Sequence, residues 1–414
     1  MTNKPHNQIE VNADRLFETI ESSAKIGVGK AGGLKRLALS DADKQVRDEF
    51  VKWCQVAGCT VRVDQAGNIF ARMEGSENLA PVLVGSHLDT QMAGGRYDGI
   101  LGVLAGLELV RCLNDHAIIP KRPIEIVNWA NEEGARFAPP MAASSVFAGT
   151  KTLEWLYGLT DDDGLTYGAE LERIGYKGAV EAKAFEIDAY FELHIEQAPE
   201  LYEKGLPLGV VTGGYKSYGM NVVFRGETAH SGPTTMDKRH NALVGAAKFI
   251  SAINDIGWEY APIGKSTASR LNVWPNKNGI LPDYAETTVD MRHKDQATTD
   301  EMVAKAHKAL AGAAQVAQVE YEIESEWSFG TEVFDQTCID LVCNIARERK
   351  IEPLMMRSQA GHDAYNMCAV APTALIFCPC IDGITHNESE DVERAPTVQA
   401  VNVLLHSVLA RANR

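Results

Sequence analysis

The order of apolar and polar positions predicts alternating helices and strands over the first half of the chain. Amphipathic helices are expected at 12–23 and 42–57, the second preceded by Ser40-Asp41, which suits a helix N-cap. A covered helix is expected at 98–114. Buried or alternating strands are expected at 60–63, 68–73, 81–85, 124–129, 189–193 and 373–377. Strands separated by helices indicate an α/β fold with a mostly parallel sheet covered on both faces.

A segment of different character interrupts this pattern between about 215 and 327. Its strands are expected at 220–224 and 284–291, and its helices at 242–253 and 299–311. Hinge-like residues that include glycine flank the segment on both sides. Because the last strand must rejoin the first sheet, we expect an inserted α+β domain at 214–329 within a larger domain formed by 1–213 and 330–414.

The composition fits a large folded protein with an acidic surface. The chain has 414 residues, of which 45% are hydrophobic, and this suits more than one domain. Its 40 Lys and Arg residues against 56 Asp and Glu residues give a formal charge of -16, so neither nucleic acid nor an anionic membrane is an expected partner. The apolar runs are shorter than the ~20 residues that cross a bilayer. The first ten residues, MTNKPHNQIE, lack an apolar signal core, so we expect a cytoplasmic protein.

The cysteine pattern indicates reduced thiols rather than a disulfide framework. Eight cysteines are scattered mostly among apolar neighbours and lack any paired CxxC spacing. Cys378-Pro-Cys380 leaves a thiolate metal site as a minor alternative, because no second cysteine pair accompanies it.

Histidine and acidic residues follow four of the predicted strands. These residues are His87 and Asp89, Glu132 and Glu133, His194 with Glu196 and Gln197, and His386 with Glu388. The carboxyl ends of parallel strands open on one crevice, so these side chains should converge. Asp98 joins them from a glycine-rich turn at the start of a predicted helix. Each residue alone is more often a hydrogen-bonded structural group, and only their co-occurrence favours a shared site.

The number and type of these side chains indicate a pair of metal ions. Five ligands are expected, namely His87, Asp98, Glu133, His194 and His386. This number is larger than the number of protein ligands that a single catalytic zinc ion uses. Two divalent ions that share a carboxylate would each have three, and mixed nitrogen and oxygen ligands suit Zn, Mn, Co or Ni. Asp89 is expected to accept the second N–H of His87 and fix its tautomer. Glu132 is expected to act as the general base.

Eight motifs together show a family resemblance that runs from about residue 10 to the end of the chain. They are GSHLDT at 85–90, GGRYDG at 94–99, NEEGARF at 131–137, ELHIEQ at 192–197, AHSGPTTM at 229–236, DMRH at 290–293, AGHDA at 360–364 and THNESE at 385–390. With these motifs the chain resembles the amidase/carbamoylase branch of the dinuclear M20 metallopeptidases. That branch contains N-carbamoyl-L-amino-acid hydrolases, β-ureidopropionases and allantoate amidohydrolases. The resemblance implies a catalytic α/β domain interrupted by a lid that also forms a homodimer interface, with Asp98 bridging the two ions and Glu132 as base.

The resemblance also implies substrate contacts that spacing alone does not show. Arg292 would bind the substrate carboxylate, a task suited to a bidentate guanidinium, although an ion pair with Asp290 or Asp295 is the alternative. Gln197 would contact the ureido group. His230 would stabilise the developing oxyanion, across the dimer.

Two further positions near the substrate follow from the same resemblance. The backbone near Gly361 would touch substrate, with the neighbouring His362 structural. Gly279 stands where relatives commonly carry an Asn, so a substrate-binding amide is either absent or supplied by Asn278. Gln359 also replaces a Gly that is often seen there.

The reaction expected from these residues is hydrolysis of the carbamoyl C–N bond of an N-carbamoyl-L-amino acid, giving the amino acid, ammonia and carbon dioxide. Closure of the lid would bring Arg292 to the substrate and exclude water. Allantoate amidohydrolase and β-ureidopropionase activities are the alternatives within the family. A metal-free binding protein is a more remote alternative, because such a protein has no reason to keep Glu132 beside Glu133.

Overall fold

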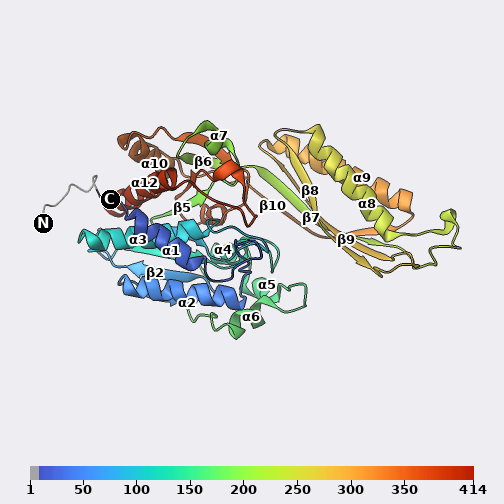
Figure 1. The fold of residues 1–414 in the computed structure, drawn as a ribbon, viewed down its shortest axis with the longest axis horizontal. Helices are drawn as coiled ribbons and strands as arrows, with labels where there is room; N and C mark the ends of the chain where they lie inside the picture. Colours follow the sequence, from blue (N-terminus) through green and yellow to red (C-terminus); the bar gives the residue numbers. More distant parts are fainter. Residues whose placement is uncertain (1–8) are drawn as a thin grey trace. The chain divides into compact units, whose positions relative to one another are not determined.

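A computed structural model describes residues 9–414 and divides the chain into two compact units. One unit contains the chain up to Gly213 together with Glu332–Arg414, and the other is Gly214–Thr331 (Figure 1). The sequence predicted 214–329 for the inserted segment. The start of the chain, from which no signal segment was expected, falls mostly outside the described residues.

The first unit is built around an eight-stranded sheet with the strand order β1-β2-β4-β3-β5-β12-β6-β11. Its strands are β1 (Thr60–Val63), β2 (Ile69–Met73), β3 (Val82–His87), β4 (Ile124–Trp129), β5 (Ala189–Ile195), β6 (Gly209–Gly214), β11 (Leu354–Ser358) and β12 (Thr373–Cys378). The central strands β4, β3, β5 and β12 are parallel to one another, whereas β2 and β6 flank them in antiparallel fashion. The four parallel strands therefore end at one edge of the sheet.

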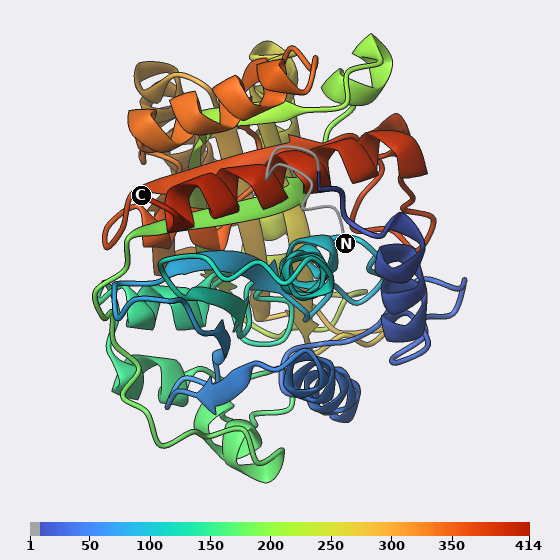
Figure 2. The same cartoon turned by 90° about the vertical axis from the view of Figure 1, so that its left-hand side faces the viewer.

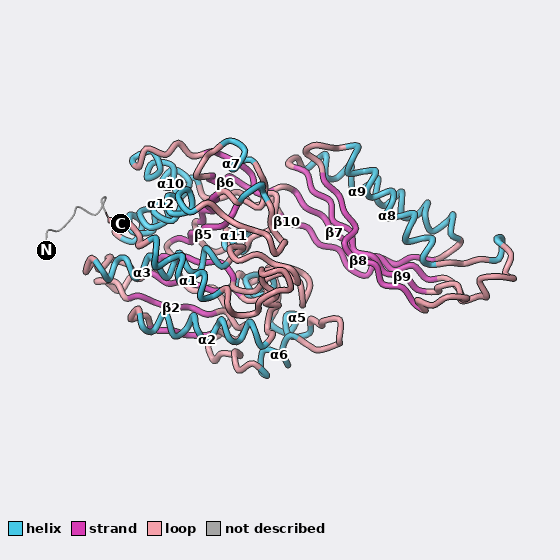
Figure 3. Tube along the Cα trace, viewed as in Figure 1, coloured by secondary structure: helices cyan, strands magenta, loops and turns pink. Residues whose placement is uncertain are grey.

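Helices cover both faces of this sheet (Figure 3). They are α1 (Ala13–Ser23), α2 (Asp41–Val56), α3 (Ile100–Asp115), α4 (Ala142–Phe147), α5 (Leu153–Gly158), α6 (Tyr167–Arg173), α7 (Glu200–Lys204), α10 (Gln336–Glu348), α11 (Asp363–Met367) and α12 (Arg394–Ala412). α3 and α12 pack on the central strands and on each other, and α12, drawn in red, crosses this face in Figure 2. α11 packs on β5 and β12 from the other side, where it also contacts α4. The α/β prediction is confirmed.

Local sequence explains why the central elements form where they do. Every residue of β3, β4, β5 and β12 is buried, as expected for the continuous apolar runs of a covered parallel sheet. Ser40 caps α2 by accepting the N–H of Asp43, as the sequence predicted. The first unit thus presents the carboxyl ends of four rigid, buried strands as a platform for side chains.

The second unit is a four-stranded antiparallel sheet with two long helices on one face. The strand order is β10-β7-β9-β8, with β7 (Lys216–Arg225), β8 (Lys265–Trp274), β9 (Tyr284–His293) and β10 (Glu320–Phe329). The helices are α8 (Ala242–Glu259) and α9 (Gln296–Ala317), which lie side by side along the sheet (Figure 1). Strict alternation of buried positions along β9 produces one apolar face, which packs on the helices. Asn241 caps α8 by accepting the N–H groups of Leu243 and Val244.

The remaining expectations concern membranes and thiols. Among residues 9–414, none of the helices has the length and apolar character needed to cross a bilayer. All eight cysteines are free, and all but Cys368 are buried. Burial raises the pKa of Cys380 to about 12, and neither Cys378 nor Cys380 belongs to a group of potential metal ligands in the described part of the chain.

Candidate metal centre

Four of the five predicted ligands come from the ends of neighbouring parallel strands. His87 is the last residue of β3, His194 is the penultimate residue of β5, and the loops after β4 and β12 carry Glu133 and His386. Asp98 lies just before α3, where Gly99 adopts a φ of +69°. A Cβ on Gly99 would lie 2.3 Å from the ring of His87, so a larger residue could not bring Asp98 this close.

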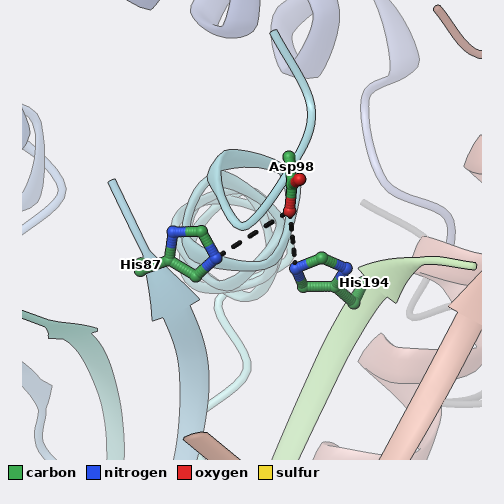
Figure 4. A group of neighbouring side chains, drawn as sticks. All are labelled: His87, Asp98 and His194. Carbon is green, nitrogen blue, oxygen red and sulfur yellow. Dashed lines mark ion pairs between the residues drawn. The ribbon is translucent and has the colours of Figure 1, made fainter. Parts of the chain in front are cut away.

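The five residues form two groups that share Asp98. The inner group is His87, Asp98 and His194, all buried, and Figure 4 shows both rings turned toward the carboxylate. Asp98 Oδ1 lies 3.1 Å from His194 Nε2 and 3.9 Å from His87 Nε2. The outer group is Asp98, Glu133 and His386.

The outer group uses the other carboxylate oxygen. His386 Nε2 lies 3.4 Å from Asp98 Oδ2 and 3.2 Å from Glu133 Oε2. Ligand atoms around a tetrahedral ion with bonds of ~2.1 Å are separated by roughly 3.4 Å. The separations in both groups are therefore close to those that a bound ion requires, with one Asp98 oxygen available to each.

Hydrogen bonds at Nδ1 leave the other nitrogen of two histidines to face the site. Nδ1 of His87 lies 2.9 Å from the main-chain oxygen of Asp89, and Nδ1 of His194 lies 2.9 Å from that of Ile195. A carbonyl only accepts, so each Nδ1 carries a proton, and in the neutral form of each ring the lone pair is on Nε2, the nitrogen that faces Asp98. This is the tautomer that a metal-ligating histidine needs.

Three side chains surround the carboxylates of the outer group. Gln197 Nε2 donates to both oxygens of Asp98, at 3.1 and 3.0 Å, and Thr385 Oγ1 donates to Oδ2 at 2.9 Å. Gln91 Nε2 donates to Glu133 Oε2 at 2.8 Å. Glu133 Oε1 and Gln197 Oε1 are buried without a hydrogen-bond partner. Two unpartnered oxygens beside the histidines are consistent with space for a cation.

The electrostatic environment favours positive charge beside Asp98. Burial lowers the pKa of His194, but the hydrogen bond and charge of Asp98 outweigh it and bring the pKa to about 9. Burial likewise opposes the charge on His386, yet Glu133 and Asp98 raise its pKa to about 11. These histidines hold the pKa of Asp98 well below its usual range despite its burial. The chemistry of the ligand set and its field therefore fit divalent cations.

Glu132 lies at the edge of the inner group. Its Oε2 is 3.4 Å from His87 Nε2, and its side chain is only 9% exposed. Burial, followed by the charges of Asp363 and Glu133, raises the pKa of Glu132 well above its usual value. The neighbouring residues 132 and 133 thus point to different partners, with Glu133 toward His386 and Glu132 toward His87.

The prediction for the side chain of Asp89 is wrong. His87 Nδ1 contacts the main-chain oxygen of Asp89, whereas the carboxylate Oδ1 lies 4.0 Å away. The turn after β3 brings this carbonyl back to the ring and leaves the carboxylate free to reach the loop after β4. There it accepts the N–H groups of Glu132 and Glu133, each at 3.3 Å. Asp89 therefore positions the loop that carries Glu132 and Glu133.

His230 and Asn278 lie in the second unit, in neighbouring segments. Nδ1 of His230 accepts the N–H of Gly232 at 3.1 Å, so a neutral ring carries its proton on Nε2. His230 also pairs with Ile280 in an isolated bridge, which places it beside the segment that contains Gly279 and the exposed Asn278. Gly279 has a φ of +89°, a left-handed conformation that side chains other than Asn rarely adopt.

Arg292 is the penultimate residue of β9 in the second unit and forms an ion pair. Its Nε donates to Asp290 Oδ1 at 2.6 Å and its Nη2 to Oδ2 at 3.2 Å. The guanidinium also lies 5.5 Å from the ring centroid of Phe329. The alternative interpretation, an ion pair with Asp290, is present.

A buried cluster of side chains behind the inner group was not predicted from the sequence. Glu192, His194 and His362 form a third cluster of potential ligand atoms, and the His362 ring lies 4.5 Å from that of His194. Glu192 accepts hydrogen bonds from Ser86, Tyr190 and the N–H of Ala364, one residue after Asp363. The alternation of side chains along β5 could have indicated this cluster, because Glu192 lies two residues before His194 and therefore on the same face of the strand. Gly361 directly precedes His362, so its backbone belongs to this end of the site.

Comparisons with known proteins point to one family. A crystal structure of an amidase of the hydantoinase/carbamoylase family from Burkholderia vietnamiensis is 43% identical, with a TM-score of 0.95, and the match covers 99% of this chain and 100% of the other. An N-carbamoyl-L-amino-acid amidohydrolase from Rhizobium meliloti is 41% identical over 99% of this chain and 98% of its own length. Another of that name from Pseudomonas sp. is 30% identical over 97% and 99%. A family model, Peptidase family M20/M25/M40, matches residues 83–410, a range that contains all five candidate ligands. The chain belongs to the M20/M25/M40 peptidase family.

Proposed function

We propose that this protein is a metal-dependent amidohydrolase that cleaves the carbamoyl C–N bond of N-carbamoyl-L-amino acids. The products are the amino acid, ammonia and carbon dioxide. Nearly the whole chain is similar to proteins named N-carbamoyl-L-amino-acid amidohydrolase, and this similarity supports the substrate class. The observation that carries the chemistry is the division of Asp98, with one oxygen toward His87 and His194 and the other toward His386.

The proposed cofactor is a pair of divalent ions per chain, with Zn, Mn, Co and Ni as candidates. His87, Asp98 and His194 would hold one ion, and Asp98, Glu133 and His386 the other. When bound, such ions polarise a carbonyl and lower the pKa of water. Each candidate histidine lies within 4 Å of Asp98, which supports this assignment of the ligands.

Glu132 is the proposed general base. Its carboxylate lies beside the inner group, is nearly excluded from solvent and is anchored through its N–H to Asp89. It would take a proton from the attacking water and pass it to the nitrogen that leaves. The acidic neighbours of Glu132 favour its protonated form, which helps the carboxylate to hold this proton between the two steps.

The proposed substrate contacts come from both units. The N–H at Nε2 of His230 would donate to the developing oxyanion, and the planar guanidinium of Arg292 would bind the substrate carboxylate in a bidentate manner. Gln197 would turn from Asp98 to the ureido group, for which its unpartnered Oε1 supplies an acceptor. The backbone at Gly361 and the amide of Asn278 are the remaining proposed contacts. A cytoplasmic homodimer, paired through the second unit, is the proposed assembly.

The test is ammonia release from N-carbamoyl-L-methionine, N-carbamoyl-β-alanine and allantoate, each assayed with added Zn or Mn. We expect turnover of the first compound and little or none of the other two. Preferential turnover of allantoate or N-carbamoyl-β-alanine would shift the assignment to the corresponding relative in the family. Chelator-treated protein is the control and should be inactive until metal is restored. A metal-loaded protein that releases ammonia from none of them contradicts the proposed substrate class.

A further inference from the structure

The segment 29–36 contacts two loops next to candidate metal ligands, namely 88–99 between β3 and α3 and the loop after β12 that contains His386. Leu34 and Gly94 form two main-chain hydrogen bonds with each other, of 2.9 and 2.8 Å, and Gly94 lies four residues before Asp98. The N–H of Arg36 donates to Thr90 Oγ1 at 2.8 Å, and the N–H of Thr90 returns a bond to the Arg36 carbonyl at 2.9 Å. These contacts fix the loop 88–99, which follows His87 and contains Asp98. The other loop, which contains His386, is held differently.

A single carboxylate attaches the His386 loop to this segment. Glu388 accepts the main-chain N–H groups of Lys30 at 3.1 Å, Ala31 at 2.5 Å and Gly33 at 3.1 Å. Successive N–H groups that converge on one anion form a nest, and hydrogen bonds to an ionised acceptor are stronger than neutral ones. Residues 29–33 therefore form a cradle of backbone donors for Glu388.

Two glycines make this close approach possible. A Cβ on Gly29 would lie 2.5 Å from Glu388 Oε2. A Cβ on Gly33 would lie 2.5 Å from Glu388 Cα and 2.5 Å from the Gly94 carbonyl oxygen. All three distances are shorter than real Cβ contacts. A side chain at Gly29 would therefore displace the Glu388 carboxylate, and one at Gly33 would push the loop itself away from the cradle.

His386 needs such an anchor more than the inner ligands do. The inner histidines lie in buried strands, whereas the His386 side chain is 48% exposed and its backbone has a φ of +50°. Non-glycine residues adopt this conformation only when the surroundings enforce it. The other end of the loop has its own anchor, because Glu390 accepts the N–H groups of Tyr97 and Asp98 at 2.9 and 3.0 Å. Loss of the Glu388 contact should therefore displace His386 and leave the rest of the loop in place.

We infer that Glu388 is a positioning residue that determines the affinity of the outer metal site without touching the ion or the substrate. The cradle at 29–33 holds its carboxylate, and the loop then presents His386 to Asp98 and Glu133. The inference rests on the divalent-ion chemistry of the proposed function. It deepens that proposal, because the affinity of the outer site can then change while the affinity of the inner site stays the same.

The experiment is metal titration of chelator-treated protein by calorimetry with Zn or Mn, comparing wild type with Glu388→Ala. Removing a partner that orients a metal ligand typically weakens binding by about 10- to 100-fold. We expect that loss for one ion per chain and unchanged affinity for the other. Glu21→Ala, at an exposed position on α1, is the matched control and should bind both ions as wild type does.

Two more variants keep the test decisive if Glu388→Ala fails to fold. Glu388→Gln keeps the size of the side chain but turns part of it into a donor that faces other donors, and Gly33→Ala disturbs the cradle itself. Both should weaken the same single ion. Unchanged affinity for both ions, or an equal loss of both, overturns the inference. If wild type binds two ions and the variants behave as expected but no carbamoyl compound is hydrolysed, only the proposed substrate fails.

Discussion

Replacing Glu132 by glutamine removes the proposed base while keeping the size and most contacts of the side chain. The main-chain anchors remain, since the N–H of Glu132 still reaches Asp89 and its carbonyl still accepts from Met141 at 2.7 Å. What changes is the group 3.4 Å from His87 Nε2, which becomes an amide that cannot take a proton at neutral pH. The structure thus isolates one chemical function in one substitution.

The size of the expected effect follows from general acid–base catalysis. A positioned base contributes about 10²- to 10⁴-fold, which corresponds to about 2.7 to 5.4 kcal/mol of transition-state stabilisation at 1.36 kcal/mol per decade. The loss should appear in kcat, with KM for N-carbamoyl-L-methionine nearly unchanged, because Glu132 is not among the proposed substrate contacts. Ammonia release measured over a range of substrate concentrations separates the two constants.

Two controls accompany this variant. Metal content should stay at the wild-type value, since Glu132 belongs to neither ligand group. The chelator-treated variant should melt at the same temperature as wild type or higher. Glu132 is buried near Asp89, Asp363 and Glu133, so its raised pKa means that its charged form destabilises the metal-free fold at pH 7. A variant that keeps wild-type turnover with its metal intact would refute the assignment of the base.

Three more results are expected from other parts of the molecule. Asp43→Asn should lower the free energy of unfolding by about 3–5 kcal/mol, measured by urea denaturation, because it removes the negative charge that lies 2.8 Å from the fully buried Arg47. A change near zero would show that this ion pair is dispensable. Arg292→Lys should raise KM by at least about tenfold with a smaller effect on kcat, since an ammonium cannot replace a bidentate guanidinium; an unchanged KM would count against the carboxylate contact. A thiol reagent at pH 8 should modify at most Cys368 quickly in the native protein and all eight cysteines after denaturation, and several fast native thiols would contradict the burial seen here.

The four central strands of the first sheet were predictable from the sequence, whereas the largely buried β6 and α12 and the exposed edge strands of the second sheet were not predicted. Strands β1 and β4 have the predicted ends, because apolar runs between turn residues define buried strands well. β8 and β10 were not predicted. Most of their residues are exposed at the two edges of the second sheet. The β8 sequence lacks the alternation that marks a strand, whereas β10 contains it, with Tyr321, Ile323, Trp327 and Phe329 separated by polar residues.

The identity of the candidate ligands could be predicted, but their division between two groups could not. Strand-end positions and the family resemblance indicated His87, His194 and His386, and the structure brings them to one carboxylate. Which oxygen of Asp98 faces which histidine depends on the turn before α3, and sequence spacing does not encode that turn. The same limit explains the wrong prediction for Asp89. Its main-chain carbonyl, rather than its carboxylate, contacts His87, and its carboxylate accepts the N–H of Glu132 instead.

The contacts of Glu388 were beyond any sequence argument. The carboxylate and its three main-chain donors are separated by more than 350 residues. Main-chain donors carry no signal in residue identity, and only the glycines at 29 and 33 hint that another part of the chain approaches closely.

Anomalous diffraction from crystals grown with Zn tests the central claim most directly. We predict two peaks roughly 3.5 to 4 Å apart, one beside His87 and His194 and the other beside Glu133 and His386, with one oxygen of Asp98 directed to each. A single peak, or two peaks that do not share Asp98, would contradict the account.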